Sequence, residues 1–290
     1  MFLDRFDVVH IASVTRKNLA AVRLAKMRSF GACQFLYTAN LQMSPGVNHY
    51  DLFRRAVKSA DQVISVSKAV ESSVASIHLP KAGLTIPNGF DPDFFDPAAA
   101  ASASENVSGG RYVLWVGVIE DRKRPDLLID IASSLPDIKF KVAGSPGREK
   151  KEDWVGRLKA CPNIEYLGSV DRSHLRALLG KAAVFLFTSD FEGLPLSLIE
   201  AIGMGVPAVV QDRSSMPEVV SKDSLGFLCD ANDLESWRAA LKKCLQDDQL
   251  NRRRQSGLAR EHAIEHYSWS SVARKYQEVY HSLWSKVNYV

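Results

Sequence analysis

The sequence has few cysteines, no long apolar run and little net charge, and each of these shortages narrows what the protein can be. Its cysteines number four in 290 residues and form no Cys-x-x-Cys pair, which favours a reduced, cytosolic setting. No apolar run approaches the roughly 18 to 20 residues that a membrane span needs. The net charge of +4 is too small to indicate a nucleic-acid partner.

The N-terminus also lacks the pattern of a secretory signal peptide. Asp4, Arg5 and Asp7 stand where an apolar segment would have to lie. We therefore expect a cytoplasmic protein, which would meet a membrane only as a peripheral protein on its inner face.

Short runs of β-branched residues alternate with helical patterns along the whole chain. Apolar strands divided by helices are typical of parallel sheets covered on both faces, which predicts an α/β protein with two doubly wound, Rossmann-like domains. The low-complexity segment PAAAASASENVSGG, residues 97–110, predicts a flexible linker between them. Roughly six strands are expected after this segment and only about three or four before it, so the first domain is short for a complete sheet.

Two glutamates stand eight positions apart in the stretch FEGLPLSLIEAIGMG, residues 191–205. An apolar strand ends just before this stretch, so we expect Glu192 in the loop at its carboxyl end and Glu200 in the helix that follows. The backbone N–H groups of Gly193, Leu194 and Leu196 would face an anion there, because the first turn of a helix leaves its amides unpaired. A carboxylate can accept two hydroxyl donors. The pattern therefore fits a diphosphate beside ribose or sugar hydroxyls, with a helix cap and a solvated side chain as the alternative.

The residues around the two glutamates resemble the signature of the group 1 (family 4) glycosyltransferases. The resemblance rests on AAVFLFTSDFEGLPLSLIEAIGMGVPAVVQDRSSMPEVV and, in the family's order, on ADQVISVSKAV, TIPNGFD, YVLWVGVIEDRKRPDLLIDI, IEYLGSVDRSHLRALLGKA and YSWSSVARKYQEVY. It implies the GT-B fold, in which two Rossmann-like domains face a cleft. The expected parts are an incomplete N-terminal domain with its linker at 1–107, a donor-binding domain at 108–269 and a C-terminal helix at 270–290 that crosses back.

The resemblance also assigns roles to individual residues. Glu200 would hold the ribose hydroxyls of a sugar nucleotide, while Glu192, with the backbone of Gly193 and Leu194, would contact the donor sugar. Lys123 falls on the family's lysine that grips the diphosphate, where a cation stabilises the charge that grows as the diphosphate leaves. Glu192 and Lys123 are thus the catalytic candidates. The further donor-binding residues would be Leu196, Arg122, Gly117, Gly168, Val170, Asn88 and Gly89, with no metal and no cofactor.

The sequence departs from the family at three places. Val118 stands where the family often has an arginine, so that Arg122 or Arg124 would have to supply the second cation. Asn40 stands where the family often has a histidine, and an asparagine cannot transfer a proton. The family's first strand and glycine-rich loop do not precede FDVVHIAS. A misassigned start, a degraded gene or a second chain that completes the sheet would each account for this, and a cut sheet would leave an unpaired edge.

Three other patterns carry less information. HAIEH, residues 262–266, places two histidines on one helix face without an evident third zinc ligand. DPD, residues 91–93, is better explained by turn chemistry than by metal binding. RKNLAAVRLAKMRSF, residues 16–30, carries five cations among apolar side chains. It predicts either a helix that lies on anionic lipid or a sheet-packing helix with a solvated face.

The resemblance thus implies a retaining, metal-independent glycosyltransferase. It would move a sugar from a nucleoside diphosphate sugar to an acceptor glycan or lipid-linked glycan, in the synthesis of cell-surface polysaccharide, glycolipid or other glycans. Two alternatives stay open. One is a sugar-nucleotide epimerase with the same fold, and the other is an incomplete or non-catalytic subunit that needs a partner chain.

Overall fold

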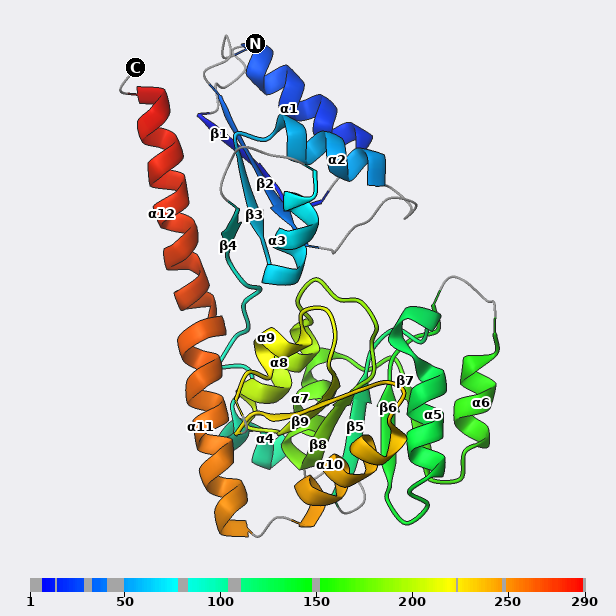
Figure 1. Cartoon of the computed structure of the whole chain (residues 1–290). Coiled ribbons are helices and arrows are strands. Elements are labelled where there is room, and N and C mark those ends of the chain that lie inside the picture. Colours follow the sequence, from blue (N-terminus) through cyan, green and yellow to red (C-terminus); the bar gives the residue numbers. More distant parts are fainter. Residues whose placement is uncertain are drawn as a thin grey trace. The chain divides into compact units, whose positions relative to one another are not determined.

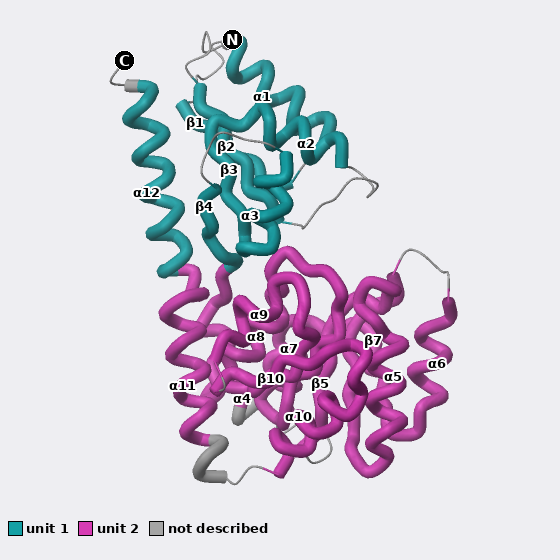
Figure 2. The backbone as a smooth tube through the Cα atoms, in the orientation of Figure 1, with its two compact units in different colours: residues 1–88, 270–290 teal, residues 89–269 magenta. Residues whose placement is uncertain are grey.

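A computed structural model describes residues 7–13, 15–28, 33–40, 50–77, 83–103, 111–147, 152–222, 224–246 and 249–288 (Figure 1). The chain divides into two compact units (Figure 2). Unit 1 comprises residues 1–88 and 270–290, and unit 2 comprises residues 89–269. Both units are α/β, and every strand pair in them is parallel, which confirms the predicted fold class.

Unit 1 contains a four-stranded sheet in the order β1-β2-β3-β4. Its long C-terminal helix packs on the sheet because Val272, Val279 and Leu283 are buried together with strand residues such as Leu36 and Ile64. Its elements are β1 (Val8–Ile11), α1 (Arg16–Arg28), β2 (Gln34–Ala39), α2 (Tyr50–Ser59), β3 (Gln62–Ser65), α3 (Lys68–Ala75), β4 (Leu84–Thr85) and α12 (Trp269–Asn288). Strand β4 is only two residues long.

Unit 2 contains a six-stranded sheet in the order β10-β9-β8-β5-β6-β7. The chain builds outward from β5 through β6 to β7, and then from β8 through β9 to β10, so the direction of winding switches between β5 and β8. The strands are β5 (Tyr112–Val116), β6 (Phe140–Ala143), β7 (Ile164–Gly168), β8 (Ala182–Phe187), β9 (Ala208–Gln211) and β10 (Gly226–Cys229). The helical elements are α4 (Pro97–Ala103), η2 (Asp121–Lys123), α5 (Pro125–Ser133), α6 (Trp154–Ala160), α7 (Arg172–Lys181), α8 (Leu196–Gly203), α9 (Met216–Val219), α10 (Leu234–Gln246) and α11 (Gln249–Tyr267).

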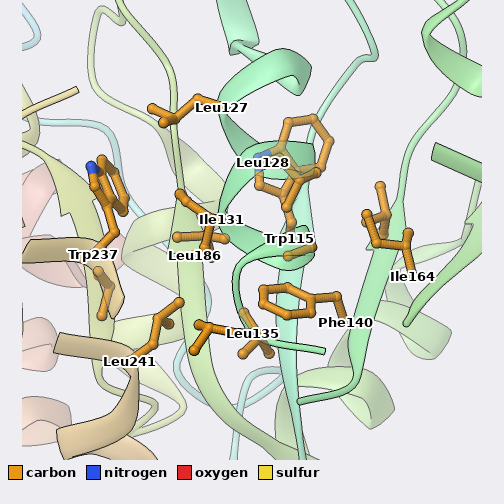
Figure 3. Packing of buried hydrophobic residues seen from close by; sticks show 14 of the residues in the cluster. Trp115, Leu127, Leu128, Ile131, Leu135, Phe140, Ile164, Leu186, Trp237 and Leu241 are labelled. Atoms are coloured by element: carbon orange, nitrogen blue, oxygen red, sulfur yellow. The ribbon is translucent and has the colours of Figure 1, made fainter. Parts of the chain in front are cut away.

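Strand β8 shows why this sheet is covered on both faces. Its residues Val184 and Leu186 join a core with Trp115 of β5 and with the apolar sides of α5 and α10, including Ile131 and Trp237 (Figure 3). The alternate residues Phe185 and Phe187, which point to the opposite face, are also fully buried, and their rings are stacked with centroids 6.0 Å apart. A strand that is buried on both faces has a continuous run of apolar residues in its sequence.

Part of the segment that the sequence predicts as a flexible linker is helical. Residues 97–103 form helix α4 within unit 2, and residues 104–110 lie outside the described residues. The described residues 89–103, which the sequence grouped with the first domain and its linker, lie in the unit that holds the donor-domain motifs. Four consecutive alanines, Ala98 to Ala101, explain the helix, because alanine has the highest intrinsic helix propensity.

Helix α8 ends in a turn that requires glycine. The N–H of Gly205 donates to the carbonyl of Ile202, and the N–H of Val206 donates to that of Ala201, which is the Schellman arrangement. Gly205 has φ +71°, and a Cβ there would lie 1.9 Å from Ser256 Oγ. Both the backbone angle and the close approach of α11 exclude a side chain at this position.

We expect Gly205→Ala to lower the free energy of unfolding by about 2 kcal/mol or more, because the left-handed conformation alone costs an alanine roughly 1–2 kcal/mol. Gly257→Ala is the matched control. Gly257 lies in α11 with nothing within 4 Å of an added Cβ, so alanine should raise stability there by up to about 1 kcal/mol. Urea denaturation of both variants measures the two shifts, and equal destabilisation would contradict this account of the turn.

Candidate functional site

The loops after β5 and β8 form the candidate site of unit 2. In an open parallel sheet, ligands bind at the carboxyl ends of the strands, where the winding direction switches. The switch in this sheet lies between β5 and β8. The loop after β5 carries Gly117, Arg122 and Lys123, and the loop after β8 carries Glu192, so the topology brings these two parts of the sequence together.

Lys123 and Glu192 form a buried ion pair at this edge. Lys123 Nζ donates to Glu192 Oε1 at 2.6 Å, and the two residues are only 9% and 8% exposed. Burial lowers the pKa of Lys123 from its usual value, and the neighbouring carboxylate of Glu192 acts in the opposite direction. The aromatic face of Phe187 lies 5.1 Å from the ammonium group. The two catalytic candidates are therefore in direct contact.

Arg122 reaches the same carboxylate. Its Nη1 donates to Glu192 Oε1 at 2.9 Å and to the carbonyl of Phe191 at 2.7 Å. Both cations thus bond one oxygen, while Glu192 Oε2 accepts no hydrogen bond from the described residues. Arg124 instead holds Asp126 with three hydrogen bonds of 2.8 to 3.0 Å. Of the two arginines that the sequence left open, only Arg122 contacts Glu192.

A buried chain of hydrogen bonds fixes the backbone of Lys123. Thr188, which is fully buried and directly follows β8, donates from Oγ1 to the carbonyl of Lys123 at 2.7 Å. The same oxygen accepts the indole N–H of Trp115 at 3.0 Å. Because an orphaned polar group in a dry interior is costly, the three partners hold one another in place.

Glu200 lies in α8 in a different environment from Glu192. Its side chain is 12% exposed, and its nearest cation is Arg172, whose Nη2 lies 3.6 Å from Oε1. Burial raises the pKa of Glu200 to about 7, and Arg172 offsets this only in part. Near neutral pH the side chain is therefore divided between the acid and the carboxylate.

Helix α8 starts between the two glutamates. Pro195 is the N-cap residue, with φ −73° and ψ 118°, and the helix begins at Leu196. The backbone N–H groups of Gly193 and Leu196 donate to no described residue, while Leu194 has a further interaction. Two of the three amides expected to face an anion are thus available for one.

The remaining predicted donor residues are spread along the chain. Gly117 directly follows β5, and Gly168 ends β7 with φ +70°, with Val170 just beyond it. These positions lie along the same edge of the sheet as Lys123, since carboxyl ends of parallel strands share one edge. Asn88 and Gly89 stand where the chain passes from unit 1 to unit 2. Their roles in nucleotide binding stay predictions.

The sequence reasoning missed the turn between β9 and α9, which contacts the loop that carries Glu192. The Oγ of Ser214 accepts the N–H of Glu192 at 3.1 Å and donates to its carbonyl at 2.9 Å. Gln211 Nε2 donates to Asp190 Oδ1 at 3.1 Å. A pair of adjacent serines at residues 214–215 gives no local signal of this role, because it depends on a contact between separate loops.

A second polar cluster lies in unit 1 and was also missed. His10 Nε2 lies 2.7 Å from Thr38 Oγ1, and its Nδ1 lies 2.8 Å from the hydroxyl of Tyr280. Tyr276 lies 3.2 Å from the same threonine. Burial lowers the pKa of His10, which favours its neutral form. Asn40, at the position of the family's histidine, donates from Nδ2 to the carbonyl of Ala12 at 2.5 Å.

The weaker sequence patterns find local explanations. The rings of His262 and His266 lie 4.4 Å apart, but no group of three potential metal ligands occurs among the residues that the structure describes. Asp91 Oδ1 accepts the N–H groups of Asp93 and Phe94, which confirms turn chemistry for the DPD stretch.

Comparison with known families identifies the central part of the chain. Residues 99–260 match the family described as "Glycosyl transferases group 1". The chain is 29% identical over 226 residues to D-inositol 3-phosphate glycosyltransferase of Mycobacteroides abscessus, covering 74% of this chain and 47% of that protein. It is 25% identical over 289 residues to phosphatidyl-myo-inositol mannosyltransferase of Mycobacterium leprae, covering 96% and 74%. The chain thus spans about half the length of the first of these relatives.

The fold also matches solved structures. Anabaena Alr3699/HepE, solved in complex with UDP and glucose, superposes with a TM-score of 0.80 at 18% identity, covering 95% of this chain and 78% of that one. This likeness shows that the fold is that of the GT-B glycosyltransferases.

The hydrogen-bond chain through Thr188 yields a stability prediction. Thr188→Val keeps the shape but leaves the indole N–H of Trp115 and the carbonyl of Lys123 without their partner. We expect a loss of about 2–4 kcal/mol in the free energy of unfolding. Thr188→Ser keeps the hydroxyl and loses one methyl group, which should cost about 1 kcal/mol. Urea denaturation compares them, and a valine variant as stable as the serine variant would show that this chain does not hold Lys123.

Proposed function

Because the chain belongs to the group 1 glycosyl transferases, we propose that it transfers a sugar from a nucleoside diphosphate sugar to an acceptor hydroxyl, with retention of configuration and without a metal ion or another cofactor. The observation that carries this proposal is the contact of Lys123 and Arg122 with Glu192 at the switch point of unit 2. Two cations and one carboxylate at that place suit a diphosphate joined to a sugar. The complex of the related fold with UDP and glucose supports the same class of donor.

Lys123 and Arg122 would bind the diphosphate. A buried ammonium group gains more from a full negative charge than a solvated one does, and negative charge grows on the diphosphate as the sugar leaves. The two cations would therefore stabilise the transition state more than the ground state. Arg122 would replace the arginine that the family often has at the position of Val118.

Glu192 and Glu200 would bind the donor's hydroxyl groups. Glu192 Oε2 has no hydrogen bond from the described residues while Oε1 accepts two, so one oxygen is available to a sugar hydroxyl next to the diphosphate. Glu200 would accept the ribose hydroxyls. Gly193 and Leu196 would add backbone amides between these two points, as helix starts do for anions.

We propose an acceptor on a glycan or a lipid-linked glycan, in the synthesis of surface polysaccharide or glycolipid. The relative from Mycobacterium leprae is named for a phosphatidyl-myo-inositol acceptor.

Unit 1 offers a surface that suits anionic lipid. A groove of about 300 Å³ between α1 and α2 is lined by five cations, namely Arg23, Lys26, Arg54, Arg55 and Lys58, of which Lys26 is paired with Asp61 at 2.6 Å. Leu24 and Met27 of α1 are 47% and 76% exposed, and no described helix is long and apolar enough to cross a bilayer.

A second proposal is that the protein acts as one subunit of such an enzyme. Strand β1 is an edge strand of the described sheet, yet all four of its residues are half-buried. A groove of about 630 Å³ runs beside it, lined by Val8, His10, Tyr280 and Trp284 among others. An extended strand of a partner chain would fit this edge.

Nucleotide binding without any transfer or hydrolysis by the chain alone would favour this second proposal. A sugar-nucleotide product with altered stereochemistry would instead favour an epimerase.

Nucleotide binding should depend on pH through Glu200. Burial raises its pKa to about 7, and hydroxyl donors favour the carboxylate, so binding should lower that pKa and release protons at pH values between the lowered pKa and about 7. Affinity should then rise with pH across this window. Calorimetry against UDP, GDP and ADP in buffers of different ionisation enthalpy measures the release.

Glu200→Ala tests the same assignment. It should weaken binding about 10- to 100-fold, the value of hydrogen bonds to a charged group. Glu200→Gln should bind weakly at every pH, because it cannot lose a proton. In the free protein, the raised pKa makes stability fall as pH rises from about 4.5 to 7, since the unfolded chain ionises first. Unchanged affinity in the alanine variant would refute the assigned role.

The basic groove predicts binding to anionic membranes. The chain should sediment with vesicles that contain phosphatidylserine at low salt but not with pure phosphatidylcholine. Replacing Arg54, Arg55 and Lys58 together by alanine should weaken this partition by about tenfold or more, since each cation near a membrane contributes up to about 1 kcal/mol. The control is Lys139→Ala with Lys242→Ala, two exposed lysines of unit 2. Equal loss in both sets, or no sedimentation of the original chain, would contradict lipid contact.

A further inference from the structure

The turn between β9 and α9 contains a residue in an unfavourable conformation. Ser214 has φ +56°, and among the described residues only Ser214 and Arg124 combine a side chain with positive φ. A left-handed conformation costs a residue other than glycine roughly 1–2 kcal/mol, and such residues persist where the surrounding contacts over-determine them. The contacts that hold Ser214 therefore have to outweigh this cost.

Those contacts converge on the backbone of Glu192. The hydroxyl of Ser214 accepts the N–H of Glu192 at 3.1 Å and donates to its carbonyl at 2.9 Å. The buried hydroxyl of Ser215 lies 3.4 Å from the same carbonyl. One side chain thus satisfies both backbone polar groups of Glu192, which belongs to a loop without regular secondary structure.

The same turn contacts the residues just before Glu192. Gln211 donates to Asp190, and the guanidinium group of Arg213 lies 5.2 Å from the centre of the Phe191 ring. Arg213 also lies 3.7 Å from Asp190 Oδ1. Three consecutive loop residues are therefore each contacted by the turn, and only the contact to Glu192 acts on the backbone that carries a candidate catalytic group.

We propose that Ser214 is a positioning residue, whose hydroxyl fixes the backbone of Glu192 and so directs the free oxygen Oε2 of its carboxylate toward the donor sugar. Lys123 and Arg122 hold Oε1 from the opposite loop. With the backbone fixed at one end and Oε1 at the other, the direction of Oε2 is set before a ligand binds. The proposal rests on the proposed function for its sugar contact, but the fixation of the loop does not depend on any ligand.

Glycine and alanine at residue 214 separate positioning from stability. Ser214→Gly removes the hydroxyl and also the cost of the left-handed conformation, so its melting temperature should stay near that of the original chain. Ser214→Ala removes the hydroxyl and keeps the cost, so its melting temperature should fall. Both should expose the N–H of Glu192, and we expect its hydrogen exchange to accelerate at least tenfold in both variants. Ser215→Ala, which loses the longer contact, should change it less.

A second experiment measures binding affinity and compares UDP with UDP-glucose, GDP with GDP-mannose and ADP with ADP-glucose. Both Ser214 variants should bind the nucleoside diphosphate within about twofold of the original chain. They should lose the affinity that the sugar adds, and donor hydrolysis should fall about 10- to 100-fold in kcat. Slow exchange at Glu192 in Ser214→Gly would overturn the proposal, as would an unchanged sugar contribution in a chain that binds these donors. Failure of the original chain to bind any of the nucleotides, with exchange at Glu192 still accelerated in the variants, would refute the proposed function and leave the fixation of the loop established.

Discussion

The candidate site depends on one buried ion pair, between Lys123 and Glu192, which joins the loops after the two strands at the switch point. Such a pair is a poor way to gain stability, because removing two charges from water costs about as much as their attraction returns. Apolar residues of similar size would serve the fold as well. Side-chain hydrogen bonds nevertheless hold the backbone of both partners: Thr188 bonds the carbonyl of Lys123, and Ser214 bonds the N–H of Glu192. We infer that the charges are kept for a ligand and that the surrounding hydrogen bonds offset their cost.

The fold class could be predicted because its signals are local. Apolar runs such as Ala182–Phe187 give a strand, and alternation with helices gives a parallel sheet. The partners Lys123 and Glu192 lie 69 residues apart, and the sequence predicted both residues through their family motifs rather than through their contact. The sequence could not decide whether Arg122 or Arg124 supplies the second cation, because family motifs do not show which side chain reaches Glu192. The structure shows that Arg124 has a left-handed backbone conformation and binds Asp126, while Arg122 donates to the carboxylate of Glu192.

What the sequence could not predict depends on contacts between loops. The role of Ser214 needs a backbone angle and a partner 22 residues away, and neither leaves a periodic pattern. The proximity of Arg172 to Glu200 likewise depends on how α7 and α8 pack. The segment of the expected linker shows a different limit. Residues 97–103 form helix α4, and a run of alanines is both low in complexity and the best helix former, so composition alone could not decide between a linker and a helix.

The two glutamates that the motif places eight residues apart are chemically different. Glu192 meets two cations, and one of them, Arg122, also donates to Glu120 Oε1 at 2.7 Å, so the four groups together carry no net charge. A diphosphate would bind to the N–H donors of the two cations, and Glu192 meanwhile prevents Lys123 from being buried as an unpaired cation. Glu200 has only a distant guanidinium group and a pKa raised to about 7 by burial. Under the proposed function, Glu192 would accept a hydroxyl of the donor sugar beside the reacting bond. Glu200 would gain full charge when the ribose hydroxyls bind, which would couple recognition of the nucleotide to the release of a proton.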